Sequence, residues 1–124
     1  HLPQSYLLGK ENQGFYITME GFDGARLLIG ATCVGAARRA LEIGMDYIKQ
    51  RKAFGRPIGK FEGVEEALTR MGGNLYMMDA ARMMTAGSID LGEKPAVASA
   101  IVKYHITEQC FAMVQVPAYC HVTD

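Results

Sequence analysis

Apolar residues recur at helical spacing along most of the chain. In the first such segment a large apolar residue stands at every seventh position, which keeps the set on one helix face: Leu27, Val34, Leu41 and Ile48. Small residues repeat at the same interval beside them: Gly30, Ala37 and Gly44. Such a stripe lets a second helix approach closely, which offsets the cost of glycine in a helix, about 1 kcal/mol relative to alanine. This helix is expected to end near Gly55, with Pro57 just beyond.

Two further helices follow. The second has the 4, 3, 4, 3 spacing of a helix that packs in a bundle: Val64, Leu68, Met71, Leu75 and Met78. It continues toward Ile89 and is expected to end before Gly92, and the third helix is expected to begin at Pro95. The apolar residues of the third helix share one face: Val97, Ile101, Tyr104, Phe111 and Val114. We expect Pro117 to bend or end it.

These patterns predict an all-α fold, an antiparallel up-down bundle of about three long helices with short links. The sequence contains no alternating strand pattern of useful length, no internal repeat and no low-complexity tract. Residues 1–14 show little periodicity and are expected to form a loop. An antiparallel bundle normally has a fourth helix, which the remaining residues cannot supply. We therefore expect a truncated four-helix bundle, cut from a longer protein.

Composition narrows the function classes. The 124 residues include 13 Lys and Arg and 13 Asp and Glu, so no net charge draws the chain to nucleic acid or to an anionic membrane. No apolar run approaches the roughly 20 residues that span a bilayer, and no signal-peptide pattern is present. The three cysteines are scattered: Cys33, Cys110 and Cys120. Their odd number fits buried thiols in a reducing compartment better than a disulfide framework.

Five cations gather within twelve residues of this neutral chain: Lys49, Arg51, Lys52, Arg56 and Lys60. With the first three in the last turns of a helix, favourable contact with the helix dipole explains them about as well as a ligand does. Phe54 favours a ligand, because a solvated helix exit is more usually polar. Gly55 and Gly59 bracket Pro57, so the backbone can turn tightly there. Since arginine matches a pyrophosphate bidentately and an aromatic ring can cover a planar one, the stretch indicates a nucleotide diphosphate.

The other candidate residues favour structural roles. Asp23 and Arg26 are three apart on the first helix and are expected to pair with each other. Phe22 is expected to belong to the core on composition alone. No serine, histidine and acid set indicates a hydrolase.

Metal binding is not predicted. His105 and Glu108 form an H-x-x-E pair without the second copy that a di-iron bundle needs. Cys120 and His121 are adjacent but lack the spaced partners of a zinc site.

One long stretch resembles the C-terminal helical domain of acyl-CoA dehydrogenases: GARLLIGATCVGAARRALEIGMDYIKQRKAFGRPIGKFEGVEEALTRMGG. The resemblance runs from about Leu8 to Glu108. It rests on three motifs: A-R-x-x-I, A-L-x-x-x-x-x-Y-x-x-x-R-x-x-F-G-x-P-I and K-Y-x-x-x-E. Two segments are most similar to the bacterial branch that acts on medium- and long-chain fatty acyl-CoAs: GKFEGVEEALTRMGG and LGEKPAVASAIVKYH. Because LLGKENQGF resembles the link from the family's middle β domain, residues 1–14 are expected to be a linker and residues 15–124 an incomplete helical domain.

The resemblance assigns candidate site residues. In the family, the arginine and phenylalanine of R-x-x-F-G reach across a subunit interface to the adenosine-diphosphate half of the neighbour's FAD, and these are Arg51 and Phe54 here. Glu62 stands where many relatives have a glutamine that faces the same FAD. The residues up to the arginine of the A-R pair flank acyl-CoA in relatives: Phe22, Asp23 and Arg26.

No catalytic residue is assigned in this chain. Ala25 stands where some relatives carry the catalytic carboxylate immediately before the arginine. Other relatives place a glutamate in a later loop, beyond a glycine-rich segment, and that position is expected to lie beyond Asp124. The tail from Val114 to Asp124 does not match the family's usual run into those glycines. The isolated chain is therefore expected to be inactive.

The resemblance also implies an activity, the FAD-dependent α,β-dehydrogenation of a fatty acyl-CoA in β-oxidation, with electrons passing to an electron-transfer flavoprotein. The implied protein is a homo-oligomer, dimer or tetramer, of the bacterial cytoplasm or the mitochondrial matrix. Two alternatives stay open: a cofactor-free helical assembly module, and a dehydrogenase of cyclic or branched acyl-CoAs.

Overall fold

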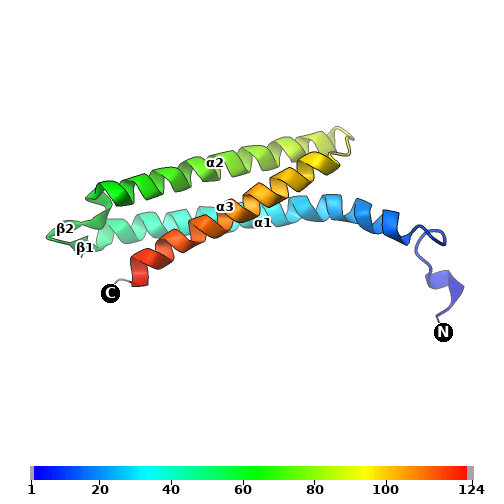
Figure 1. The fold of residues 1–124 in the computed structure, drawn as a ribbon, viewed down its shortest axis with the longest axis horizontal. Helices are drawn as coiled ribbons and strands as arrows, with labels where there is room; N and C mark the ends of the chain where they lie inside the picture. The colour runs from blue at the N-terminus through cyan, green and yellow to red at the C-terminus, as the bar shows by residue number, and fades with distance from the viewer. Residues whose placement is uncertain (1, 123–124) are drawn as a thin grey trace.

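A computed structural model describes residues 2–122. Its long helices are α1 (Gly14–Gln50), α2 (Glu62–Asp90) and α3 (Ala96–Val122). The short elements are the 3₁₀ helices η1 (Gln4–Tyr6) and η2 (Ile58–Lys60) and the strands β1 (Lys52–Ala53) and β2 (Arg56–Pro57). Helix α2 runs back along α1, and α3 returns across them (Figure 1). The predicted all-α up-down bundle is therefore confirmed, and no helix of the described part is long and apolar enough to cross a membrane.

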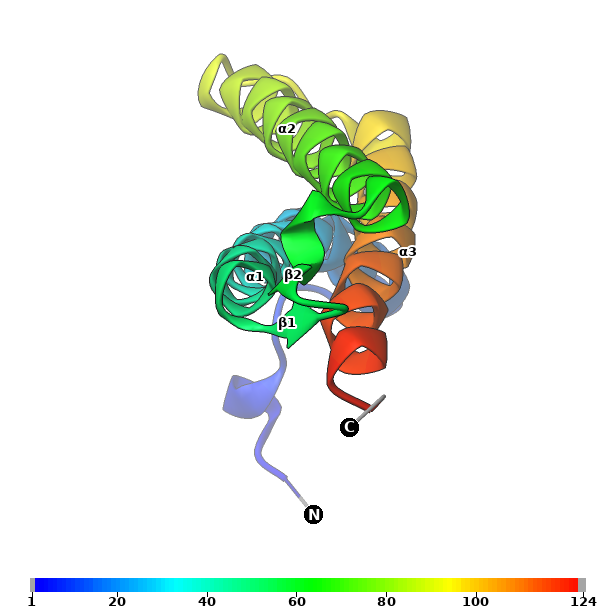
Figure 2. The same ribbon diagram turned by 90° about the vertical axis from the view of Figure 1, so that its left-hand side faces the viewer.

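The core lies where the three helices meet, and an end-on view places one helix at each corner of a triangle (Figure 2). Its buried apolar side chains come from all three: Val34, Ala37, Met71, Met78, Val102, Ile106, Cys110 and Met113. The stripe predicted on α1 is confirmed, since Gly30, Ala37 and Gly44 are all buried. A Cβ atom on Gly30 would lie 3.5 Å from Cδ1 of Ile106, and one on Gly44 would lie 3.6 Å from Cγ of Pro117. Small residues thus let α3 lie directly against α1.

The apolar face predicted for α3 does not face this core. Its members are 47% to 74% exposed, and they are called here the outer face of α3: Val97, Ile101, Tyr104, Phe111 and Val114. The buried face of α3 carries a different set: Ser99, Val102, Ile106, Cys110 and Met113. Because α3 is apolar on two sides, residue spacing alone could not decide which side meets the other helices. The helix also continues past Pro117 to Val122, so that proline does not end it.

Polar contacts join the helices at their edges. Asn74 donates a hydrogen bond across the α2–α3 boundary to Gln109, at 2.7 Å between Nδ2 and Oε1. Arg38 Nη2 on α1 lies 3.1 Å from Oδ2 of Asp79 on α2. A hydrogen bond from Arg82 is the main cause that lowers the pKa of Asp79 below its usual value.

Two cysteines contribute to the α1–α3 contact as free thiols, Cys33 and Cys110. Burial, together with the neighbouring Cys33 thiol, raises the pKa of Cys110. Cys110 is therefore held as a neutral thiol at physiological pH and behaves as a small apolar side chain. The side chain of Cys120 lies outside the described residues.

The connector between α1 and α2, residues 51–61, corrects the predicted end of the first helix. Helix α1 ends at Gln50 rather than near Gly55, so Arg51 is its extended C-cap residue and Lys52 lies in β1. An antiparallel hairpin follows, in which Lys52 pairs with Pro57 and Ala53 with Arg56. Two-residue strands are too short to show an alternating pattern, which is why the sequence did not reveal them.

The hairpin turn consists of Phe54 and Gly55, called here the tip. Both have positive φ, 53° and 79°, as a type I′ turn requires. Glycine adopts this conformation freely, whereas a bulky residue there is strained. Gly55 therefore suits the backbone conformation of this turn, and Phe54 does not.

The link between α2 and α3 agrees with the prediction. Gly92, with φ of 84°, lies just past the end of α2, and its N–H donates to the carbonyl of Ile89 at 2.9 Å. The N–H of Glu93 donates to the carbonyl of Ser88 at 3.0 Å, which satisfies a second terminal carbonyl. Pro95 directly precedes α3.

The packing at Gly44 predicts the effect of a larger side chain. We expect Gly44→Leu to lower the free energy of unfolding by about 1–3 kcal/mol, because its Cβ alone would already meet Pro117 and Leu68. Urea unfolding followed by circular dichroism measures the change. The control is Gly35→Leu on the same helix, where an added Cβ meets nothing within 4 Å. Equal losses at the two positions would contradict this packing.

The strain at Phe54 predicts an unusual mutational pattern. Phe54→Asn and Phe54→Val both remove the ring, but asparagine tolerates positive φ and a β-branched residue does not. We therefore expect the asparagine variant to be more stable to unfolding than the valine variant by about 1 kcal/mol. Comparing the two thermal or urea transitions isolates the backbone contribution, because the lost ring contacts are the same in both. Equal stabilities would mean that Phe54 is not strained.

Candidate cofactor and substrate sites

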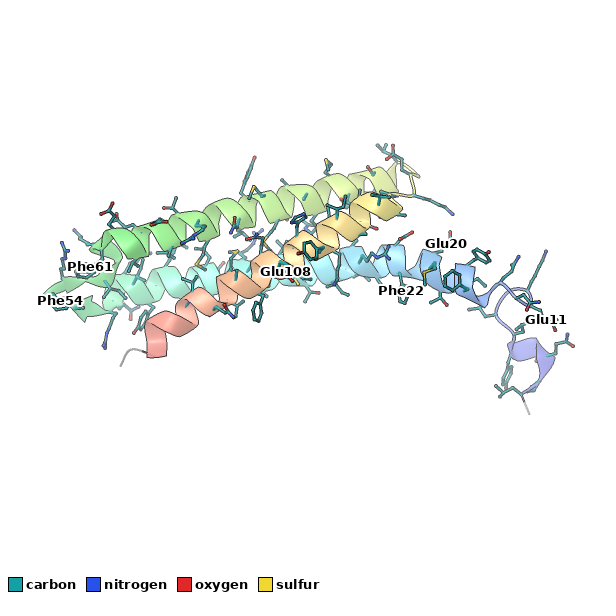
Figure 3. All side chains as sticks on the ribbon, in the orientation of Figure 1. Glu11, Glu20, Phe22, Phe54, Phe61 and Glu108 are labelled. Atoms are coloured by element: carbon teal, nitrogen blue, oxygen red, sulfur yellow. The ribbon has the colours of Figure 1, made fainter. Side chains whose placement is uncertain are left out.

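The tip of the hairpin presents an aromatic ring to the surroundings. Phe54 is 96% exposed, and Figure 3 shows it at one extreme end of the bundle, next to Phe61. A bulky residue in the left-handed region costs about 1–2 kcal/mol, and an exposed ring returns little of that through packing. Backbone strain that local packing does not explain is typical of sites that contact another molecule.

Phe61 organises this tip from the start of α2. Its ring meets that of Phe54 edge-on, with centroids 6.3 Å apart and an interplanar angle of 79°. The guanidinium carbon of Arg56 lies 4.2 Å from the centroid of the same Phe61 ring, a cation–π contact. Sequence reasoning missed this role of Phe61; the one available signal was an aromatic residue placed directly before a helix.

η2 fixes the position of Phe61 against α1. A Cβ atom on Gly59 would lie 3.0 Å from Cδ1 of Ile48, so η2 packs tightly on the last turns of α1. The N–H of Phe61 donates to the carbonyl of Ile58 at 3.1 Å. The ring on which the tip rests is therefore anchored to the bundle.

Arg51 starts from a backbone held on two sides. Its N–H donates to the carbonyl of Tyr47 at 2.9 Å, and its own carbonyl accepts from the N–H of Ile58 at the same distance. The side chain is exposed. Arg51 is the C-cap residue of α1, where its positive charge interacts favourably with the helix dipole.

Glu62 has a local structural reason to be acidic. It is the first residue of α2, and a carboxylate there interacts favourably with the positive end of the helix dipole. The side chain is exposed. Its charge therefore needs no cofactor to explain it.

Arg51 and Phe54 belong to the connector, and Glu62 follows it directly as the first residue of α2; the connector lies at one end of the bundle (Figure 1). A guanidinium and an exposed aromatic ring are the side chains that bind a diphosphate and cover a planar base, so they fit the adenosine-diphosphate half of FAD. Because all three are exposed, they form one wall of a site and do not enclose a ligand.

The substrate-side candidates lie at the other end of α1. Figure 3 shows Phe22 far from Phe54, toward the N-terminal end of the helix. Asp23 and Arg51 are 28 residues apart on one continuous helix and its cap, a separation of about 40 Å. One chain therefore does not bring the two candidate sites together.

The pairing predicted for Asp23 and Arg26 is confirmed. Arg26 Nη1 lies 2.6 Å from Asp23 Oδ1, and the two side chains are about one-third exposed. The prediction that Phe22 belongs to the core is wrong, because its side chain is 48% exposed. The first turns of α1 extend beyond the other two helices (Figure 1), which leaves this ring without a covering helix in the described chain.

A shallow pocket lies beside this ion pair, lined by Met19, Glu20, Asp23, Arg26, Lys94 and Ala96. Lys94, from the α2–α3 link, donates to Glu20 at 2.6 Å between Nζ and Oε1. This hydrogen bond is the main cause that lowers the pKa of Glu20 and raises that of Lys94. The contact ties the projecting start of α1 to the rest of the bundle.

One of the two positions expected for a catalytic carboxylate lies within the described residues. Ala25 lies half-buried in the N-terminal part of α1, where its methyl group offers no acid or base. Asp124, beyond which the resemblance places the other carboxylate, lies outside the described residues, as does Thr123 before it. The placement of a base beyond Asp124 therefore stays a prediction.

Among the side chains that the structure describes, residues 2–117, no set of three or more His, Cys, Asp or Glu could hold a metal ion. His105 packs against Tyr104, with ring centroids 5.2 Å apart, and Glu108 is exposed in the middle of α3 (Figure 3). The side chains of Cys120 and His121 lie outside the described residues.

Comparison with known proteins assigns the fold to a family. Residues 12–116 match the family described as "Acyl-CoA dehydrogenase, C-terminal domain". The chain is 34% identical over 107 residues to acryloyl-CoA reductase (NADH) of Anaerotignum propionicum, covering 86% of this chain and 27% of that protein. It is 40% identical over 90 residues to an acyl-CoA dehydrogenase of Bacillus subtilis (strain 168), covering 73% of this chain and 23% of that protein.

A solved structure has the same arrangement of helices. The acyl-CoA dehydrogenase from Geobacillus kaustophilus superposes with a TM-score of 0.94 at 26% identity, over 97% of this chain and 32% of that one. The chain thus spans about a quarter of the length of the curated relatives it matches. By sequence and by fold, the chain belongs to the acyl-CoA dehydrogenase family, in which it corresponds to the C-terminal helical domain.

Proposed function

We propose that the protein containing this chain is an FAD-dependent dehydrogenase that introduces an α,β double bond into a fatty acyl-CoA thioester. The observation that carries the proposal is the tip of the hairpin, where Phe54 is 96% exposed on strained backbone beside the capping Arg51. Family membership supplies the cofactor class, because acyl-CoA dehydrogenases are FAD-dependent flavoproteins. The proposed setting is the bacterial cytoplasm or the mitochondrial matrix, with an electron-transfer flavoprotein as electron acceptor.

In this proposal the chain's connector holds the cofactor's nucleotide half. Bound FAD would supply hydride acceptance from the substrate's β carbon. Arg51 donates paired hydrogen bonds to the diphosphate, and Phe54 covers the adenine ring. Glu62, at the start of α2, faces the same region without contributing a cation. These contacts bind and orient, and none of them moves a proton.

The substrate-side residues act at the opposite end of α1. Arg26, held by Asp23 at 2.6 Å, presents a fixed cation, and the exposed ring of Phe22 offers an apolar wall to the acyl-CoA. Ala25 carries no carboxylate, so proton abstraction is not assigned to this position. The proposal instead assigns that step to a carboxylate beyond Asp124.

The distance between the two ends favours a site shared by subunits. About 40 Å of helix separates Arg51 from Asp23, so the tip is far from the substrate-side residues of its own chain. A tip that contacts FAD therefore contacts the FAD of a neighbouring subunit. Homo-oligomer formation then places tip and substrate residues of different subunits together. The outer face of α3 is apolar and exposed, which favours its being covered by a fourth helix of the bundle or by another subunit. Residues 1–14 are proposed to lead in from a preceding domain, with residues 15–124 forming the incomplete helical domain.

Arg51 provides the direct test. In the whole oligomer, we expect Arg51→Ala to weaken FAD binding about tenfold or more, because a charge-assisted contact to the diphosphate is lost. Titrating FAD into apoprotein and following flavin fluorescence measures this.

Lys49→Ala is the matched control for Arg51→Ala, because Lys49 lies in the last turn of α1, is exposed and forms a 3.8 Å pair with Asp46. Unchanged FAD affinity in Arg51→Ala would favour the alternative, a cofactor-free assembly module in which Arg51 serves only as a helix cap.

Substrate class is tested separately. We expect the whole protein to show its highest kcat/KM on straight medium- or long-chain acyl-CoAs, measured as turnover with an artificial electron acceptor across a panel of thioesters. A clear preference for branched or cyclic acyl-CoAs would contradict the fatty-acyl assignment while leaving the FAD assignment intact.

A further inference from the structure

We propose that Arg56 is a second cationic ligand for the diphosphate of the neighbouring subunit's FAD, acting beside Arg51. This inference rests on the proposed function and extends it to a position that the recognised motif leaves unspecified. Arg56 occupies the variable position of F-G-x-P, so the resemblance assigns it no role.

The register of the hairpin places both arginines on one face. Ala53 is paired with Arg56, and the N–H of Ile58 donates to the carbonyl of Arg51 at 2.9 Å, so Arg51 stands opposite Ile58. Residues two apart on a strand point to the same side. Arg51 and Arg56 are therefore diagonal neighbours on one face, about 7–8 Å apart at their backbones. Side chains as long as these can converge from that separation on one small anion.

The residue between the arginines leaves space for a ligand. Ala53 shares their face, lies directly opposite Arg56 and carries only a methyl group. The other pair of the ladder, Lys52 and Pro57, points to the opposite side. The face with the two arginines thus carries two cations, with only the methyl group of the half-buried Ala53 between them.

Arg56 is also oriented in advance. Its guanidinium lies 4.2 Å from the centroid of the Phe61 ring, and that ring is anchored to α1 through η2. Within residues 2–122, Arg56 forms no salt bridge, although the side chain is exposed. Stacking on an aromatic face leaves the in-plane N–H donors available. A guanidinium with fixed orientation and available donors loses less freedom on binding an anion.

The chemistry of a diphosphate calls for two such groups. The diphosphate of FAD carries one negative charge on each phosphate, and one guanidinium paired bidentately satisfies one of them. A second guanidinium on the same face matches the other. The ring of Phe54, edge-on to the ring that supports Arg56, then lies beside the phosphates, where an adenine could be covered.

The test compares Arg56→Gln with Lys60→Gln in the whole apo-oligomer. Both variants remove one exposed cation of the connector, but Lys60 ends η2 and lies outside the paired strand residues. FAD, ADP and FMN are titrated separately, and thermal unfolding of each apoprotein is recorded. We expect Arg56→Gln to lower the affinity for FAD and for ADP about tenfold. The affinity for FMN and the unfolding midpoint should stay unchanged. Lys60→Gln should leave all affinities within about twofold.

Two further variants separate charge from orientation. Arg56→Lys keeps the charge without the planar fork, and Phe61→Leu keeps Arg56 without its aromatic support. We expect each variant to lower the affinity for ADP by less than Arg56→Gln does. Equal affinities in Arg56→Gln and Lys60→Gln, while Arg51→Ala binds FAD weakly, would overturn the role of Arg56 alone. A loss that extends equally to FMN, or that follows a lowered unfolding midpoint, would also overturn it. Unchanged FAD affinity in both Arg51→Ala and Arg56→Gln would contradict the proposed function as well.

Discussion

The close contact between α1 and α3 is the constraint on which the rest of the structure depends. Gly30, Ala37 and Gly44 form a stripe without bulk, and Ala37 is completely buried against its neighbours. Ile106 and Pro117 of α3 occupy the space that larger side chains would take. With α3 seated there, Met71 and Met78 of α2 close the third side of the core. Flexible methionine side chains fill such an irregular junction well.

The same stripe holds a long helix whose two ends carry the candidate site residues. A helix of 37 residues is about 55 Å long, and isolated helical segments of that kind depend on tertiary packing for their stability. The middle of α1 packs against α3, while its first turns project past the bundle and its last turn leads into the hairpin (Figure 1). The two candidate sites are thereby about 40 Å apart along one helix, which agrees with the proposal that subunits share a site.

The spacing of apolar residues predicted the three helices, because one helix face repeats about every seven residues. It did not always identify which apolar face is buried. On α1 and α2 the repeats identified in the sequence include the buried core residues Val34, Met71 and Met78. A second apolar repeat on α1, with Phe22, Ile29 and Ile43, is exposed. On α3 two sides are apolar, and the repeat led to Phe111 and its companions when Ile106 and Met113 were the buried residues. Periodicity reports that a face is apolar, not which neighbour covers it. A helix face that binds another subunit and a helix face that packs in the core have the same apolar spacing.

The candidate site shows a similar division. Motif resemblance named Arg51 and Phe54, but it could not show that a type I′ turn holds Phe54 at positive φ. Nor could spacing show that Phe61 supports both the tip and Arg56, because that contact depends on η2 bringing the start of α2 back against α1. A turn selected for stability alone would place asparagine or glycine where Phe54 stands. Since the exposed ring contributes little to the fold that bears its strain, the strain is most simply explained by what the ring contacts outside this chain.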